Sequence, residues 1–353
     1  MKKILALTTA LTAVGFAASA ADVTVMSWGG DYTKSQVEAY HKPFTAATGT
    51  NVVSVDSDNP APQVKTMVEA GNVTVDVADV EYSDAIRLCD EGLLEPIDPA
   101  SLPAGVDGTA AADDFLPGAL TDCAVSTIVF STVYGYDSSK FPNGGPTTMA
   151  DFFNLEKFPG KRAMRKGAKA NLEMALMADG VPASDVYATL ATPEGVDRAF
   201  AMLDKIKAQT VWWEAGAQPP QLLADGEVAM STAYNGRLFG AAVGEGKPFV
   251  TVWDGQVYEY DLFVIPKGAP NKDGAMEFLK FATSTQALAD QAKWISYGPA
   301  RKSSAALVGL YQDGKTEMAP YMPTAPANMT NALASSYEFW VDHDGELNER
   351  FNA

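Results

Sequence analysis

Short apolar runs alternate along the chain with longer stretches whose apolar residues recur at helical spacing. Strand-like runs at residues 23–28, 51–55 and 75–80 are each followed by such a helical stretch. The same alternation returns after residue 192, where a helix that starts at Thr192 and Pro193 precedes a strand at 211–213. Repeated strand–helix order predicts parallel sheets with right-handed crossovers, and therefore an α/β fold.

Two longer strand-like segments, residues 126–136 and 258–266, are candidates for crossings between two domains. The chain that remains after a leader is removed, about 330 residues, is too long for one ordinary core. We therefore expect two lobes, each a mostly parallel sheet flanked by helices, with the two crossing strands as the hinge. The expected boundaries are a leader at 1–20, lobe 1 at 21–127 plus 262–305, lobe 2 at 128–261, and C-terminal helices at 306–353 that brace the lobes.

The start of the chain has the form of an export signal. Met1–Lys3 is a short basic head, Ile4–Ala17 is an apolar core, and Ala18–Ala20 is a small-residue cleavage site. The apolar core is too short for a membrane-spanning helix, and no later stretch reaches that length. The signal contains no Cys to carry a lipid. We predict cleavage after Ala20 and a soluble, periplasmic product.

The chain is acidic, with a formal net charge of −18 at pH 7. Loss of Lys2 and Lys3 with the leader brings the mature protein to −20, which is −18 minus 2. A surface of this sign argues against nucleic acid or anionic lipid as a partner.

Cysteine and histidine are scarce. Cys89 and Cys123 lie in an oxidising compartment, which predicts one structural disulfide worth about 3–4 kcal/mol; two separate buried thiols are the alternative. The two histidines, His41 and His343, are far apart in sequence and are interpreted as surface or structural residues. Two Cys and two His are too few for a thiolate or His-rich metal site and leave little choice for a His-dependent triad. We therefore expect neither a metal nor a cofactor.

A single cation and a single anion stand at neighbouring strand ends. Arg237 lies in residues 231–237, which follow an apolar run and break at Gly236, and Asp261 opens a strand at 262–265. Such a pair can hold the two ends of a zwitterion, or it can belong to an ordinary surface charge network.

A Gly-Gly turn ends the first strand, and Trp28 directly precedes it. Gly29 and Gly30 separate this strand from the helix that follows. Strand, turn and helix start together have the form of a ligand-accepting loop at the carboxyl end of a parallel strand.

Four motifs carry a family resemblance: Trp28–Tyr32 (WGGDY), Cys89–Asp98 (CDEGLLEPID), Leu223–Met230 (LADGEVAM) and Asn271–Ala275 (NKDGA). In this order and spacing they resemble the spermidine/putrescine branch of periplasmic solute-binding proteins, over nearly the whole mature chain. The resemblance implies a type II fold whose two α/β lobes close on a ligand. It also implies a monomer that delivers its small-molecule ligand to an ABC permease in the inner membrane, without catalysis.

The resemblance places ligand-binding residues as well. It implies an aromatic box around the aliphatic part of the ligand (Trp28, Tyr32, Tyr234), a loop that touches one ligand end (Tyr82, Ser83), and a carboxylate that receives an ammonium (Asp261).

Two departures from the diamine-binding pattern change the expected ligand. Residues 165–170 supply only cations and small residues where diamine binders place carboxylates, and Arg237 stands where putrescine-preferring relatives carry an Asp. An ammonium buried beside a guanidinium is strongly disfavoured, whereas a carboxylate there can take a bidentate pair of charge-assisted hydrogen bonds. We therefore expect a short ω-amino acid such as 4-aminobutyrate, as in the 4-aminobutyrate-binding members; 5-aminopentanoate or a sulfonate meets the same charges.

Further cleft residues are predicted together with their alternatives. Trp213 and its neighbour Trp212 point to opposite faces of a strand, so one belongs to the core and the other can line the cleft. Gln218 binds the ligand or caps its helix. Glu81 receives a second ammonium or pairs with Arg237, and Tyr297 closes the cleft floor or packs. The predicted ligand-binding residues are Trp28, Gly30, Tyr32, Glu81, Tyr82, Ser83, Trp213, Gln218, Tyr234, Arg237, Asp261 and Tyr297.

Two other functions fit parts of the pattern. A polyamine binder of the same fold would use Glu81 and Glu259 in place of the missing acids, and it would tolerate the loss of Arg237. An exported hydrolase or lyase would need a nucleophile with a base, and the chain has neither a G-x-S-x-G motif nor a well-placed His.

Overall fold

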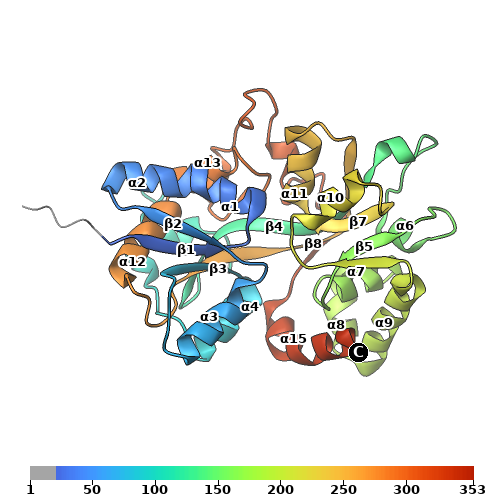
Figure 1. Cartoon of the computed structure of the whole chain (residues 1–353), viewed down its shortest axis with the longest axis horizontal. Coiled ribbons are helices and arrows are strands. Elements are labelled where there is room, and N and C mark those ends of the chain that lie inside the picture. Colours follow the sequence, from blue (N-terminus) through green and yellow to red (C-terminus); the bar gives the residue numbers. More distant parts are fainter. Residues whose placement is uncertain (1–20) are drawn as a thin grey trace, which may run out of the picture.

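A continuous mixed sheet runs through the molecule in the computed structural model, which describes residues 21–353 (Figure 1). The predicted leader, residues 1–20, lies outside the described residues. The main path of the sheet has the order β2-β1-β3-β8-β4-β7-β5-β6, with β10 beside β8 and β9 beside β4. The strands are β1 Val23–Ser27, β2 Val52–Asp56, β3 Val77–Glu81, β4 Ala124–Asp137, β5 Arg162–Arg165, β6 Thr210–Trp213, β7 Met230–Tyr234, β8 Phe249–Val264, β9 Gly298–Pro299 and β10 Ala332–Ala334.

The sheet has two parallel ends and an antiparallel centre. Strand β1 pairs in parallel with β2 and β3, and β5 pairs in parallel with β6 and β7. We call β1–β3 with their helices the first half and β5–β7 with theirs the second half. The long strands β4 and β8 pair antiparallel with each other and run from one half into the other (Figure 1). The predicted α/β fold with two strand crossings is confirmed.

Asp261 lies within β8 and does not open a strand. The prediction was wrong because residues 249–264 form one 16-residue strand whose pairing with β4 is interrupted only by local register shifts. The local structure at Arg237 also differs from the prediction, which placed this residue at the end of a strand. Strand β7 continues to Tyr234, and Arg237 lies in the helical turn α11 that follows.

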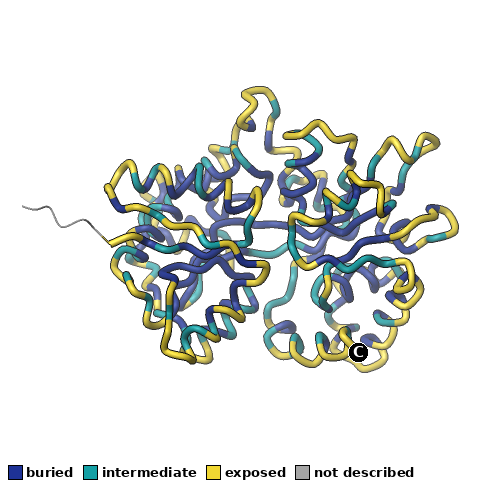
Figure 2. The backbone as a smooth tube through the Cα atoms, viewed as in Figure 1, coloured by how far each residue is buried: buried dark blue, intermediate teal, exposed yellow. Residues whose placement is uncertain are grey.

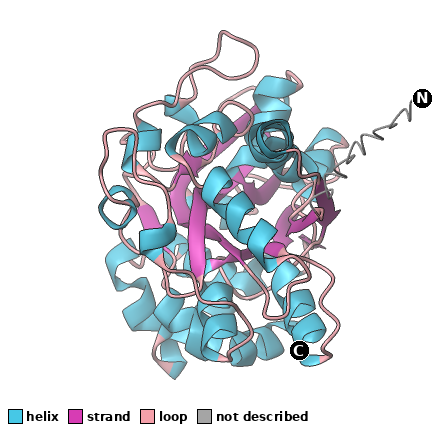
Figure 3. Cartoon of the chain, turned by 90° about the vertical axis from the view of Figure 1, so that its left-hand side faces the viewer, coloured by secondary structure: helices cyan, strands magenta, loops and turns pink. Residues whose placement is uncertain are grey.

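Helices cover both faces of the sheet (Figure 3). Those of the first half are α1 Gly30–Gln36, α2 Lys42–Thr48, α3 Pro60–Glu69, α4 Tyr82–Asp90, α5 Ala111–Asp114, α12 Lys272–Ala282, α13 Thr285–Gln291 and α14 Lys302–Ala305. Those of the second half are α6 Met149–Phe153, α7 Asn171–Ala178, α8 Val186–Leu190, α9 Pro193–Lys207, α10 Gln218–Ala224 and α11 Asn235–Phe239. A π-helical segment, Val37–His41, joins α1 to α2.

Each half has its own apolar core, and the buried backbone follows the strands through the middle of the molecule (Figure 2). In the first half Phe263 and Phe278 pack beneath β1, and in the second Phe152 and Met164 pack beneath α7. Separate cores on both sides of the two crossing strands favour a hinge at those strands.

The C-terminal segment contains one long helix, α15 Tyr337–Asn352, preceded mainly by loops. Trp340 of α15 is buried in the core of the second half, and its indole N–H donates to Glu173 at 2.7 Å. The same helix packs against α4 of the first half, where the Tyr82 and Tyr337 rings lie 4.6 Å apart. Helix α15 therefore contacts both halves.

The predicted disulfide is confirmed. Cys89 at the end of α4 is bonded to Cys123, directly before β4, across 34 positions in sequence. A loop of this size contributes about 3–4 kcal/mol in the chain-entropy account. Within residues 21–353 no helix is long and apolar enough to cross a membrane.

Candidate functional site

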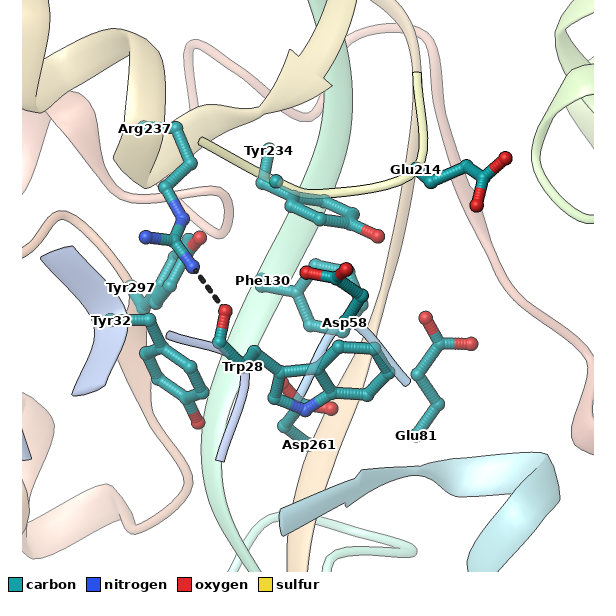
Figure 4. Close-up of a pocket in the computed structure, with 11 residues that line it drawn as sticks. Trp28, Tyr32, Asp58, Glu81, Phe130, Glu214, Tyr234, Arg237, Asp261 and Tyr297 are labelled. Carbon is teal, nitrogen blue, oxygen red and sulfur yellow. Dashed lines mark hydrogen bonds between the residues drawn. The ribbon is translucent and has the colours of Figure 1, made fainter. Parts of the chain in front are cut away.

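A cavity lies where the loops after β1 and β3, the end of β7 and the middle of β4 and β8 meet (Figure 4). The space between its lining atoms is about 390 Å³, part of it open to solvent. Seven of the predicted residues line it: Trp28, Tyr32, Glu81, Tyr234, Arg237, Asp261 and Tyr297. Five of them lie at or just after the carboxyl ends of the parallel strands β1, β3 and β7, as the carboxyl-end rule for α/β sheets predicts.

Arg237 projects from α11 of the second half towards the first half. Its side chain is only 4 % exposed, and Nη2 donates to the carbonyl oxygens of Trp28 at 3.2 Å and Gly29 at 2.9 Å. The Nε and Nη1 groups are buried and have no hydrogen-bond partner within residues 21–353. Because buried donors are normally paired, the guanidinium has unused capacity for an anion.

Gly30 lets the β1–α1 loop approach this guanidinium. A Cβ atom built on Gly30 would lie 2.6 Å from Nη1 of Arg237, closer than any real contact, and the backbone there has φ +55°. Glycine is therefore required here both for space and for its left-handed conformation. Gly30 does not line the cavity itself but supports the position of Arg237.

Asp261 is a buried acid of the cavity. It lies within β8 opposite Glu81 of β3 and is 6 % exposed. Its Oδ1 atom is buried without a hydrogen-bond partner among the described residues. Burial raises the pKa of Asp261 well above its usual range, and the nearby carboxylates of Asp79, Glu81 and Glu259 raise it further. The carboxyl therefore favours its neutral form until a cation approaches.

Aromatic rings form the walls between these two groups. Tyr32 and Tyr297 meet edge to face at 5.4 Å, and Phe130 and Tyr234 do so at the same distance. Figure 4 shows the Trp28 indole between Arg237 and Glu81, in front of Asp261. Apolar ring faces of this kind suit the methylene part of a short ligand.

Trp213 does not line the cavity, contrary to the prediction. It is 1 % exposed in the core and packs behind Tyr234, with ring centroids 5.5 Å apart. Trp212 points to the other face of β6 and meets Phe351 at 5.1 Å. Tyr234 lies between Trp213 and the cavity, and Trp212 is on the opposite face of β6, so neither tryptophan lines the ligand space.

Glu81 is held by two cations of the second half. Its carboxylate accepts from Nη1 of Arg165 at 2.7 Å and from Nζ of Lys169 at 3.0 Å. Burial acts to raise the pKa of Glu81, but Lys169 and Arg165 outweigh it and bring the pKa to about 2. The expected alternative of a Glu81–Arg237 pair is therefore wrong, because Arg165 and Lys169 take that carboxylate.

The other predicted residues lie outside the cavity lining. Ser83 accepts from Nζ of Lys169 at 3.3 Å, and Tyr82 stacks against Tyr337 of α15. Gln218 accepts from the backbone N–H groups of Glu214 and Ala215, so it shapes the loop before α10; it does not cap the helix, which has no side-chain cap.

Four lining residues were missed in the sequence: Asp58, Phe130, Glu214 and Gly216. Asp58 and Glu214 follow strands, and the carboxyl-end rule points to such positions. Phe130 lies inside the apolar run of β4, where nothing in the sequence distinguishes it from a core residue. Among residues 21–353, no group of three or more His, Cys, Asp or Glu side chains is arranged to hold a metal ion.

Among residues 21–353, the cavity between the two α/β halves is lined by a buried guanidinium with two unpaired donor groups and a buried carboxyl with one unpaired oxygen, an arrangement typical of a binding protein for a small polar molecule. Residues 39–324 match the family of bacterial extracellular solute-binding proteins. The gamma-aminobutyric acid-binding protein of Pseudomonas aeruginosa is 47 % identical over 347 residues, which are 97 % of this chain and 94 % of that protein.

Two solved structures show the same architecture. The structure of the Atu4243 GABA receptor is 34 % identical with a TM-score of 0.78, covering 94 % of this chain and 97 % of the receptor. The binding protein MotA from A. tumefaciens B6, in complex with glucopine, is 32 % identical with a TM-score of 0.85, covering 94 % and 98 %. The chain belongs to the bacterial extracellular solute-binding proteins and has the type II periplasmic-binding-protein fold. These relatives are binding proteins and not enzymes.

Proposed function

We propose that this protein captures a short ω-amino acid of the 4-aminobutyrate type for an ABC importer. The observation that carries the proposal is that two groups with unpaired polar atoms line the same cavity. Arg237 has two buried N–H groups without partners, and Asp261 has a buried carboxylate oxygen without one, among residues 21–353. A zwitterion with a short methylene chain supplies the missing partner to each.

The carboxylate end is assigned to Arg237. Two backbone carbonyls already bind Nη2, so we expect the ligand to bind through Nε. The Nε atom lies beside Gly216 of the cavity wall: a Cβ atom built on this glycine would be 3.6 Å from it. Hydrogen bonds between ionised groups are about twice as strong as neutral ones. This contact also compensates the desolvated guanidinium, which favours a ligand carboxylate over a neutral group.

The ammonium end is assigned to Asp261. An ammonium beside this carboxyl would favour its charged form and reverse the effect of burial on its pKa. The aromatic walls made by Trp28, Tyr234 and Phe130 would bury the methylene chain between the two ends. The relatives named for gamma-aminobutyric acid support a ligand of this type.

The polyamine alternative is weaker. At the Asp261 end of the cavity, Glu81 and Glu259 already bind Lys169, at 3.0 and 2.6 Å, so a second ammonium there would find neither carboxylate free. A diamine would also bring a cation close to the Arg237 guanidinium, which is electrostatically unfavourable.

Closure of two lobes explains how the ligand is retained. We place lobe 1 at residues 21–127 plus 262–305 and lobe 2 at 128–261, with β4 and β8 as the hinge. Arg237 would then bind the Trp28 and Gly29 carbonyls only when the lobes are closed, so a ligand that holds Arg237 stabilises closure. We place the mature protein in the periplasm, as a monomer that meets its permease in the inner membrane.

Calorimetric titration of the purified mature chain tests the assignment. The panel is 4-aminobutyrate, 5-aminopentanoate, β-alanine, taurine, glucopine, putrescine and spermidine. We expect one of the first two to bind most tightly and the two polyamines not to bind. Tightest binding of putrescine or spermidine would refute the role of Arg237 as a carboxylate receptor, and tightest binding of glucopine would refute the short ω-amino acid.

A further inference from the structure

Lys169 occupies a site built for an ammonium group. Its Nζ atom lies 2.6 Å from Oε2 of Glu259, 3.0 Å from Oε2 of Glu81 and 3.3 Å from Oγ of Ser83. An ammonium has three N–H donors, and here each has an oxygen acceptor. The side chain is only 11 % exposed, so the contacts are shielded from solvent.

Arg165 closes the same end of the cavity. Its Nη1 atom donates to the second oxygen of Glu81 at 2.7 Å. The guanidinium carbon lies 5.8 Å from the ring centres of both Trp28 and Tyr234, which are walls of the cavity. The two cations therefore stand beyond the aromatic walls, on the side of the cavity bounded by Glu81.

The segment that carries both cations is held in a fixed shape. The Asn171 side chain donates to the carbonyl oxygens of Arg165 at 2.6 Å and Gly167 at 2.8 Å. Ala170 has φ +66° and is the one residue other than glycine with a positive φ in the described part of the chain. A non-glycine residue in this region is strained, and such strain persists where the surroundings impose a required geometry.

The charges at this end leave room for one ammonium. Glu81, Glu259 and Asp261 lie together because Glu81 and Asp261 are register partners and Glu259 and Asp261 point to the same face of β8. Lys169 and Arg165 bind Glu81 and Glu259, which leaves the carboxyl of Asp261 without a cation among the described residues.

We propose that Lys169 determines specificity by filling, from within the chain, the position that the second ammonium of a diamine would take. The inference rests on the proposed function, because it explains how the end of the cavity where Glu81, Glu259 and Asp261 lie together accepts a ligand with one ammonium. With the Lys169 ammonium in place, a second ligand cation finds Glu81 and Glu259 already paired. Without it, these two carboxylates form an open ammonium receptor beside the ligand space.

The test compares two lysines of one segment. Lys169→Met removes the charge but keeps a long apolar side chain. Lys166→Met is the matched control, because Lys166 is half exposed and pairs at 3.1 Å with the exposed Glu214 at the mouth of the cavity. Affinities for putrescine, spermidine and 4-aminobutyrate are measured by calorimetry for both variants and for the unmodified protein.

We expect Lys169→Met to raise the affinity for putrescine relative to that for 4-aminobutyrate by at least about tenfold, the change of one well-placed charged contact. Lys166→Met is expected to change this ratio by less than about twofold. An unchanged ratio in Lys169→Met, or an equal rise in both variants, would overturn the proposal, because the effect would then be absent or due to overall charge.

A second measurement covers the case in which Lys169→Met is unstable. In Lys169→Ala, added ethylammonium should refill the vacated site and raise the melting temperature more than it does in the unmodified protein, with sodium at the same concentration as control. No selective rise would overturn the proposal. A variant that folds only with putrescine or ethylammonium supports it, and one that folds with neither refutes it.

The two proposals fail in different ways. If the unmodified protein does not bind a short ω-amino acid, the proposed function fails whatever the variants do. If it binds 4-aminobutyrate but Lys169→Met gains no preference for putrescine, only the role of Lys169 fails.

Discussion

The Nη2 atom of Arg237 lies 2.9 Å from the carbonyl oxygen of Gly29, across the boundary between the two halves of the molecule. Residues 208 positions apart in sequence are thereby joined directly at the cavity. One cation thus does two things: it holds the β1–α1 loop through backbone carbonyls, and it presents free donors to the ligand space. Substitutions at Arg237 and at the loop that receives it should therefore alter ligand binding.

Replacement of Arg237 by lysine should weaken binding of 4-aminobutyrate by about 100-fold. Lysine keeps the charge, but its donors sit on one nitrogen, whereas the planar guanidinium spreads its donors between the loop carbonyls and the ligand carboxylate. A loss of one to two charge-assisted hydrogen bonds, about 3 kcal/mol, corresponds to this factor. Calorimetry measures it, with Arg198→Lys as control because Arg198 pairs with Asp179 on the surface. Undiminished affinity in Arg237→Lys would show that the carboxylate binds elsewhere.

Gly30→Ala should lower ligand affinity at least about tenfold, because the new methyl group would displace the Arg237 guanidinium from its position. The matched control is Gly71→Ala. Gly71 has a similar φ of +63° but nothing within 4 Å of its Cβ position. Both changes should cost about 1–2 kcal/mol of unfolding free energy, measured by urea denaturation, since both place alanine in the left-handed region. Equal ligand affinity in the two variants would contradict a role for Gly30 in placing Arg237.

Binding of 4-aminobutyrate should release protons and should tighten as pH rises. In the empty protein, burial raises the pKa of the Asp261 carboxyl, so this group holds its proton to higher pH than usual. A ligand ammonium lowers that pKa and displaces the proton, so binding becomes more favourable at lower proton concentration. Calorimetry in buffers of different ionisation enthalpy counts the protons.

The Asp261→Asn variant isolates the contribution of this carboxyl. Neighbouring acids also respond to burial, which raises the pKa of Asp79 to about 7 and acts to raise the pKa of Glu259 against the opposing effect of Lys169. Proton release that persists undiminished in Asp261→Asn would assign it to those neighbours and refute the pairing of Asp261 with the ammonium.

His41 should make the protein less stable in mild acid. It is buried between Ser54, whose hydroxyl lies 3.0 Å from Nδ1, and the ring of Phe278 at 5.5 Å. Burial lowers the pKa of His41 from 6.5 to about 4. Between these values the unfolded chain binds the proton and the folded protein does not, so stability falls as pH falls through this window.

The expected loss from His41 alone is about 3 kcal/mol between about pH 7 and about pH 4. Urea denaturation at both pH values gives the loss of unfolding free energy on acidification for the unmodified protein and for His41→Gln. The difference between these two losses is the contribution of His41. The variant should lose correspondingly less stability on acidification. An equal loss in both proteins would show that other groups cause the acid sensitivity.

Local patterns were enough to predict much of the fold. The strand–helix alternation, the crossing strands and the Cys89–Cys123 bridge are all present in the structure. Strand β5 was missed because it carries arginines at both ends. Arg162 is nevertheless buried, because its guanidinium donates to the backbone carbonyls of Phe152, Asn154, Phe158 and Gly160. No pattern within the strand shows that these acceptors will surround it.

By itself, the sequence determined the class of fold, the family, and the presence of a cation at 237 and an acid at 261. These follow from periodicity, motifs and residue type, which are properties of short segments. The tertiary structure alone decided which charges remain unpaired. Lys169 meets Glu81, 88 positions away, whereas Asp261 and part of Arg237 find no partner within residues 21–353. The physical reason is that charge compensation depends on distances between segments, and only the folded sheet and its two crossing strands set those distances.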